Sequence, residues 1–290
     1  MTQHLEAQDD GWLMRPMKNW AAEKLDYLER YLDMFTTAMR KKPWRALNYI
    51  DLFAGPGKCQ DEGTGEIYLG SPLLALRTRQ SFDHYFFVEL DADNMQALQQ
   101  RCQHSPQADR IRYFQEDCNV AVHRIAREIQ RVDQHYIEGV WPCLNLAFLD
   151  PEGLVELHWD TVQALAQLRT DLVIHYSQMG LQRYMPIAIE SSEETSIDRF
   201  FGSRDWREIY EQGQGKPGMY GDLIRFYKDR LCELGYVEVK IDDQIERVPM
   251  MRNMKNAPLY CLIFASKNDL GEKFWREVTR RDKDGQLWMF

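Results

Sequence analysis

The feature that most constrains the fold is a regular alternation of strand-like and helical patterns along the chain. Five apolar segments, separated by stretches of helical periodicity, are expected to be strands: 47–53, 84–90, 111–115, 144–149 and 171–176. The fourth is apolar at every position except one, which is typical of a strand covered on both faces. This alternation predicts an α/β fold with a parallel sheet between two layers of helices.

The last third of the chain predicts a different strand arrangement. Segments 236–241 and 259–265 are two further strand candidates, and residues 242–258 between them show no helical pattern. Because no crossover helix joins these strands, we expect them to pair antiparallel. The complete prediction is a seven-stranded, mostly parallel sheet with an antiparallel C-terminal strand.

The domain organisation follows from the same patterns. Residues 46–290 are expected to form one α/β domain, with an inserted helical lobe at about 178–216. Residues 1–45 are expected to form an N-terminal helical extension, because apolar residues recur at three- and four-residue steps over 16–39.

The charge balance limits the partners of the chain. Lys and Arg total 36 and Asp and Glu total 45, so the formal net charge is −9. This balance argues against a basic sheath around nucleic acid, although a local basic face stays open. The arginines and lysines between residues 199 and 230 alternate with acids, which favours an ordinary salt-bridged surface.

The sequence also indicates a compartment and the absence of a metal site. The apolar stretches are shorter than a bilayer requires, and Met1–Asp10 is polar and acidic, unlike a signal peptide. We therefore expect a cytoplasmic protein with no membrane association. No metal is expected, because the six cysteines form no C-x-x-C pair and the histidines no H-x-x-x-H pair.

Acidic residues follow four successive predicted strands. They are Asp51, Glu89, Asp117 and Asp150. In an open α/β sheet, ligands bind beyond the carboxyl ends of the strands, near the point where the strand order reverses. Each acid could instead cap the helix that follows it. Their recurrence at four strand ends favours a ligand site.

A glycine turn follows the first strand and indicates which ligand. The turn Gly55-Pro56-Gly57 would let backbone approach a ligand closely. The third glycine of the dinucleotide fingerprint is absent, and Glu89 lies 34 residues after Gly55, where about 20 are expected. An insertion over 58–70 lengthens that distance. The pattern favours S-adenosylmethionine over a nicotinamide dinucleotide, and no P-loop motif is present.

These motifs resemble a known family. Asp51–Gly57 (DLFAGPG) looks like motif I of class I S-adenosylmethionine-dependent methyltransferases, and the chain from about Trp20 to Trp275 resembles the three-Cys-motif partner proteins (TcmP). Asp150-Pro151-Glu152-Gly153 is similar to the D-P-P-Y motif of methylases that act on exocyclic amines. The other matching features are Trp20, Lys24, Leu28 and Tyr31 in the leading helix, and the segments 70–73, 148–151, 199–202 and 259–267.

The resemblance implies a Rossmann-like class I methyltransferase fold with S-adenosylmethionine as cofactor, and it assigns site residues by position. Glu89 would bind the ribose, Asp117 the adenine, and Asp150 would lie where the methyl group meets its acceptor. The implied cofactor-binding residues are Asp51, Phe53, Ala54, Gly55, Gly57, Glu89, Asp117, Cys118 and Asp150. The implied catalytic residues are Asp150 and Glu152, and the implied substrate-binding residues are Pro151, His158, Tyr176 and Arg183.

Three functions stay open at this point. The first is a methyltransferase of unknown acceptor, with nucleic acid as one candidate; Glu152 and Gly153 replace the second proline and the aromatic residue of the base-methylating motif. The second, implied by the resemblance, is a non-catalytic partner subunit of a three-cysteine-motif, radical-enzyme-like protein encoded nearby. The third is a Mg²⁺-dependent nuclease or nucleic-acid modifier.

Overall fold

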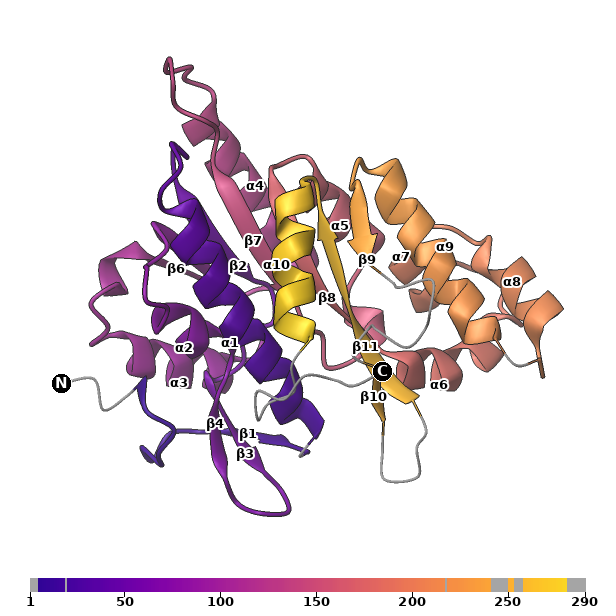
Figure 1. Ribbon diagram of the computed structural model, residues 1–290. Helices are drawn as coiled ribbons and strands as arrows, with labels where there is room; N and C mark the ends of the chain where they lie inside the picture. Colours follow the sequence, from indigo (N-terminus) through magenta and orange to yellow (C-terminus); the bar gives the residue numbers. More distant parts are fainter. Residues whose placement is uncertain (1–4, 19, 217, 241–249, 253–257, 281–290) are drawn as a thin grey trace.

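The alternating segments form one mostly parallel sheet between two layers of helices (Figure 1). The computed structural model describes residues 5–18, 20–216, 218–240, 250–252 and 258–280. Five parallel strands lie in the order β6-β5-β2-β7-β8. Their bounds are Leu47–Asp51 for β2, His84–Val88 for β5, Ile111–Phe114 for β6, Leu144–Leu149 for β7 and Thr170–Tyr176 for β8.

The C-terminal strands reverse direction at one edge of this sheet. Strand β11 (Pro258–Ser266) pairs antiparallel with β8, and β9 (Glu238–Lys240) pairs antiparallel with β11. All seven predicted strands are therefore present, and the predicted antiparallel pair is confirmed. A further strand, β10 (Met250–Arg252), also pairs with β11 and was not predicted, because three residues carry no periodic signal. Residues 241–249 and 253–257 of the predicted connection lie outside the described residues.

The order of the strands identifies the fold class. Numbered along the chain without β10, the predicted strands lie in the order 3-2-1-4-5-7-6, with the seventh antiparallel. A dinucleotide-binding Rossmann sheet has the order 3-2-1-4-5-6 and no antiparallel strand at this place. The chain therefore has a Rossmann-like, class I methyltransferase-like α/β fold, as predicted.

The first helical layer includes the N-terminal helix. Figure 1 shows α1 and α10 crossing the front of the sheet. Tyr31 and Phe35 of α1 are buried in one core with Tyr49 of β2 and Phe264 of β11, so α1 packs directly on the sheet. The helices of this layer are α1 (Trp20–Met39), α2 (Ser71–Leu76), α3 (Ala92–Cys102) and α10 (Asp269–Thr279).

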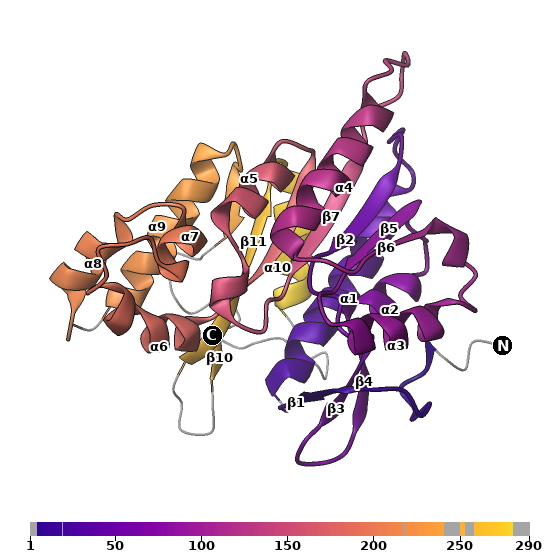
Figure 2. The same cartoon turned by 180° about the vertical axis from the view of Figure 1, so that it is seen from behind.

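The second layer covers the opposite face (Figure 2). Its core is rich in aromatic side chains, among them Trp159, Phe200, Trp206 and Tyr227. The predicted lobe over 178–216 contains α6, α7 and α8. The helices of this layer are α4 (Cys118–Asp133), α5 (Trp159–Ala166), α6 (Gln178–Ala188), α7 (Ser196–Phe201), α8 (Trp206–Gly213) and α9 (Met219–Glu233). Short 3-10 turns lie at Ala108–Arg110 and Leu154–Glu156.

A second, three-stranded sheet lies beside the first layer. The insertion over 58–70 forms a hairpin of β3 (Lys58–Asp61) and β4 (Ile67–Leu69), and β1 (Arg15–Met17) pairs parallel with β3. The prediction of a helix beginning at residue 16 was therefore wrong at its first turn. Residues 15–17 gain their backbone partners from a hairpin more than 40 residues away, and a local pattern cannot show such pairing.

Within the part of the chain that the structure describes, no helix combines the length and the apolar character needed to cross a bilayer.

Candidate functional site

The parallel strands bring the four predicted acids to one edge of the sheet. Asp51 ends β2, Glu89 follows β5, Asp117 follows β6 and Asp150 follows β7. Because these strands run in one direction, their carboxyl ends meet at the same edge. Strand order reverses beside β2, so the glycine turn that follows it lies at the switch point where such folds bind ligands.

The glycine turn requires glycine for two reasons. Gly55 and Gly57 have φ angles of 61° and 88°, in the left-handed region that other residues rarely adopt. A Cβ atom on Gly57 would also lie 3.0 Å from Leu98 and 3.3 Å from Leu73. A Cβ on Gly55 would meet no atom within 4 Å. The backbone at Gly55 therefore faces open space, which a ligand can approach.

Glu89 connects this turn to the neighbouring strand end. Its Oε2 accepts a hydrogen bond of 2.9 Å from the Gly55 amide, and its Oε1 accepts one of 2.8 Å from the Asp91 amide. The carboxylate is half-buried and lies beside the open space at Gly55. This position suits the recognition of a ligand hydroxyl, because a carboxylate oxygen can accept more than one hydrogen bond.

Asp117 lies where predicted and also caps a helix. Its Oδ1 accepts a hydrogen bond of 2.7 Å from the Asn119 amide at the start of α4. Its side chain is exposed, whereas Cys118 is buried. Two apolar side chains near these strand ends are exposed: Leu90 at 68% and Val120 at 55%. They provide exposed apolar surface close in the chain to the acids that follow β5 and β6.

Asp51 is buried at the end of β2. It accepts hydrogen bonds from the Tyr49 hydroxyl at 3.1 Å and the Phe53 amide at 3.3 Å. Burial raises the pKa of Asp51 to about 7, although hydrogen bonds from Ser71, Phe53 and Tyr49 oppose that rise. Ala54, next in the turn, donates its amide to Val88 of β5 at 2.8 Å. Asp51 thus anchors the base of the glycine turn.

Asp150 lies in a buried cluster of charged and aromatic groups. Lys24 of α1 donates to both of its carboxylate oxygens, at 2.7 and 2.6 Å. The Nδ1 atom of His175 lies 3.5 Å from Asp150 Oδ1. Burial alone would raise the pKa of Asp150, but the positive charges of Lys24 and Arg15 outweigh burial and lower it. Asp150 is therefore ionised at neutral pH.

His175 and Tyr260 complete the wall beside Asp150. Their rings lie 4.4 Å apart between centroids, and the Lys24 ammonium lies 5.7 Å from the Tyr260 ring. Burial lowers the pKa of His175 to about 3, and the charge of Lys24 adds to this effect. The imidazole is thus neutral at the pH at which Asp150 is charged.

Glu152 differs from Asp150 in its exposure. Its side chain is 63% exposed and forms an ion pair with Arg15 of β1, with 3.1 Å between Arg15 Nε and Glu152 Oε1. Its backbone amide donates to Glu156 at 3.1 Å. The two predicted catalytic acids therefore have different partners from the N-terminal segment: Lys24 for Asp150, and Arg15 for Glu152.

The predicted substrate-binding residues are not all brought together. Pro151 is buried next to Asp150, and His158 precedes α5, with its amide donating to Asn119 at 3.0 Å. Arg183 is exposed on α6, with its guanidinium over the ring of Tyr184.

Tyr176 points to the other face of the sheet from His175, because successive side chains of a strand alternate. It packs between Phe200 and Tyr227, at 5.7 and 5.6 Å between ring centroids. This placement fits a core residue better than a residue that contacts substrate beside Asp150.

Two basic residues at this site, Arg15 and Lys24, were not predicted as functional. Lys24 appeared only as part of the leading-helix pattern, and Arg15 carried no signal. Both reach the site through contacts with residues more than 100 positions away in the chain. A hydrophobic pattern reports which face of a helix is buried, but it does not identify a charged partner at such a separation.

Comparison with known proteins adds little to this description. No family model matches the chain, and no curated protein matches it. Among solved structures, the fold is similar to protein LPL1258 from Legionella pneumophila, of family DUF519, with 10% identity, a TM-score of 0.49 and coverage of 89% of this chain and 90% of that one.

Two further solved structures are similar to the chain. One is a provisionally assigned O-methyltransferase from Klebsiella pneumoniae, with 9% identity, a TM-score of 0.41 and coverage of 82% of this chain and 79% of that one. The other is a provisionally assigned S-adenosylmethionine-dependent methyltransferase from Methanococcus maripaludis, with 13% identity, a TM-score of 0.35 and coverage of 86% of this chain and 90% of that one. The fold assignment rests on the order and direction of the strands.

Proposed function

We propose that this protein binds S-adenosylmethionine and transfers its methyl group to an acceptor beside Asp150. The observation that carries the proposal is the Gly55–Gly57 turn, joined to Glu89 by a hydrogen bond at the point where strand order reverses. This arrangement combines a close backbone approach with a carboxylate at the next strand end. The sequence resemblance to the three-Cys-motif partner proteins supports the same cofactor.

The residues at the strand ends suit each part of an adenosyl ligand. The ribose hydroxyls would donate to Glu89, and the adenine amino group to Asp117. The exposed side chains of Leu90 and Val120 offer apolar contacts to the adenine ring. When bound, S-adenosylmethionine supplies an electrophilic methyl group on its sulfonium.

The acceptor end of the site would use Asp150. Its carboxylate is ionised, buried and fixed by Lys24, so it is able to hold a hydrogen-bond donor in one place. A substrate amine or hydroxyl that accepts the methyl group would donate a hydrogen bond to the Asp150 carboxylate. The lone pair of the substrate nitrogen or oxygen would then point away from Asp150. Glu152, at the exposed side, is then available to a larger substrate.

Calorimetry with S-adenosylmethionine and S-adenosylhomocysteine tests the proposal. We expect both ligands to bind, and Glu89→Gln to weaken both about tenfold or more, because a charged acceptor of the ribose hydroxyls is lost. Asp93→Asn, an exposed acid in the same α3 region, is the matched control and is expected to leave binding unchanged. No heat with either ligand on folded protein would refute the proposal.

A second candidate function is a non-catalytic adenosyl-binding subunit. The observation in its favour is that Lys24 already donates to both oxygens of Asp150, which occupies the acceptor side. The partner would be the three-cysteine-motif protein that the sequence resemblance implies. Co-expression, co-purification and a methyl-transfer assay with and without that partner, using RNA, DNA and protein acceptors, separate the two candidates.

A further inference from the structure

The proposed cofactor site has an unbalanced charge. The charged residues of its predicted cofactor-binding set are all acids, whereas the methionine portion of S-adenosylmethionine carries a carboxylate as well as an ammonium group. A carboxylate placed among other carboxylates is stable only beside a cation or several hydrogen-bond donors. The predicted cofactor-binding set contains no cation, so a cation that pairs with this carboxylate would come from another part of the chain.

The N-terminal strap, which we define as residues 5–17, lies next to the glycine turn. Arg15 in β1 is the register partner of Cys59 in β3, only two residues after Gly57. The strap therefore runs alongside the segment that leaves the turn (Figure 1).

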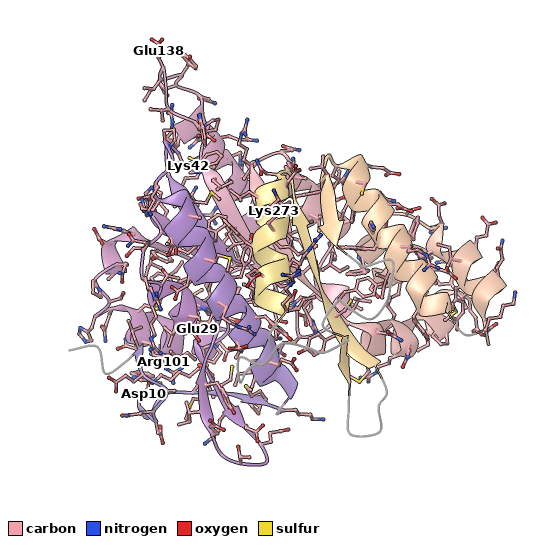
Figure 3. All side chains as sticks on the ribbon, viewed as in Figure 1. Asp10, Glu29, Lys42, Arg101, Glu138 and Lys273 are labelled. Carbon is pink, nitrogen blue, oxygen red and sulfur yellow. The ribbon has the colours of Figure 1, made fainter. Side chains whose placement is uncertain are left out.

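A buried ion network locks the strap to the turn. Asp10 accepts from Arg101 at 2.7 and 2.9 Å and lies 2.8 Å from Lys58 Nζ. The same Arg101 guanidinium donates to the carbonyls of Leu13 in the strap, at 2.8 Å, and Pro56 in the turn, at 2.6 Å. Arg101 and Lys58 are completely buried, and Figure 3 labels Arg101 and Asp10. The position of Arg15 relative to the turn is thus fixed by contacts that do not involve Arg15.

Arg15 lies at the strand end of β7, where its Nε is 3.1 Å from Glu152 Oε1. The carboxylates of Asp150, Glu152 and Glu89 raise its pKa, against the opposing effect of burial. Its charge is therefore influenced by the acids that follow β7 and β5, the two strands that flank β2. Lys24, in contrast, is held by both oxygens of the buried Asp150. Glu152, which pairs with Arg15, is largely exposed and can move away.

We infer that Arg15 binds the α-carboxylate of the cofactor's methionine portion, exchanging Glu152 for the ligand. The inference rests on the proposed function, because it concerns the same cofactor. A guanidinium is suited to this task, since its planar donors match a carboxylate in a bidentate pair. The strap then forms the wall of the cofactor site opposite the sheet.

Calorimetry with two ligands that differ only in this carboxylate tests the inference. The probes are S-adenosylmethionine and decarboxylated S-adenosylmethionine. We expect Arg15→Gln to weaken the binding of S-adenosylmethionine about 10- to 100-fold and to leave the affinity for the decarboxylated ligand unchanged. Arg112→Gln, which removes an exposed strand arginine paired with Glu128, is the matched control and is expected to change neither affinity.

A second variant gives an independent measurement. Glu152→Gln removes the carboxylate that competes with the ligand for Arg15. This variant is expected to bind S-adenosylmethionine severalfold more tightly and the decarboxylated ligand with unchanged affinity. Equal losses for both ligands in Arg15→Gln, or no loss for either, would overturn the inference. If the wild-type protein binds neither ligand, the proposed function fails as well; if it binds both equally, only the inference about Arg15 fails.

Discussion

Asp150 is the residue whose surroundings most affect the chemistry of the site. It is buried, yet its pKa is lowered rather than raised, because Lys24 contacts both of its oxygens. A buried carboxylate with one close cation depends strongly on that cation. Local sequence identified the acid from its place at a strand end, but it offered no means of identifying the lysine.

Replacement of Lys24 by methionine tests this dependence. We expect Lys24→Met to destabilise the protein by about 3–5 kcal/mol at pH 7, because Asp150 loses its closest cation. The folded-state pKa of Asp150 lies below its unfolded value, so its stabilising contribution is present at neutral pH and is lost as the pH falls. The loss measured by urea denaturation should therefore shrink at acidic pH. Lys42→Met, at an exposed lysine, is the control and should change stability by less than about 0.5 kcal/mol.

The elements show where sequence patterns suffice and where they do not. The strands of the parallel sheet were predicted because their apolar runs and the helical periodicity between them are local properties. The hairpin β3–β4 and its partner β1 were not predicted: the insertion over 58–70 has no alternating apolar face, and the parallel pairing with β1 joins distant segments. The element that carries Arg15 to the site is thus one that the sequence did not indicate.

Asp10 is expected to control the order of this second sheet. Asp10→Asn leaves the buried side chains of Lys58 and Arg101 without their shared counter-charge, so residues 5–17 and 58–70 should exchange amide hydrogens faster. The matched control is Asp9→Asn, one residue earlier and exposed. Hydrogen exchange with mass spectrometry gives the readout. Unchanged protection in both segments would show that the network does not hold the strap.

At the scale of the whole molecule, Asp171 joins three elements. It lies in β8, accepts a hydrogen bond of 2.7 Å from Ser266 of β11, and lies 3.4 Å from the hydroxyl of Tyr31 in α1. Burial raises its pKa to about 7, although the hydrogen bonds from Ser266 and Tyr31 oppose that rise. The protonated carboxyl therefore fits the folded state better than the carboxylate does.

The stability of the protein should consequently depend on pH through Asp171. Its folded-state pKa exceeds the unfolded value of 3.8, so its favourable contribution is complete below pH 4 and is lost as the pH rises through about 7. Between pH 5 and pH 8, the free energy of unfolding measured by urea denaturation should fall by about 2–3 kcal/mol more for the wild type than for Asp171→Asn. Asp229→Asn, at an exposed acid, should follow the wild type. Parallel pH profiles for wild type and Asp171→Asn would contradict this expectation.

The sequence by itself determined the alternation of strands and helices, the reversal at the C-terminal edge, and the four acids with their glycine turn. These features are local, because each depends on the types and spacing of residues that lie close together in the chain. Only the tertiary structure decided which cations accompany those acids, because Lys24 and Arg15 reach Asp150 and Glu152 across more than 120 residues of chain. Tertiary packing also decided that Tyr176 faces an aromatic core while His175, its neighbour, faces Asp150. The physical reason is that electrostatic and packing interactions join residues that are close in space but far apart in the chain. Hydrophobic periodicity depends only on residues that are neighbours in the chain, so it cannot identify such partners.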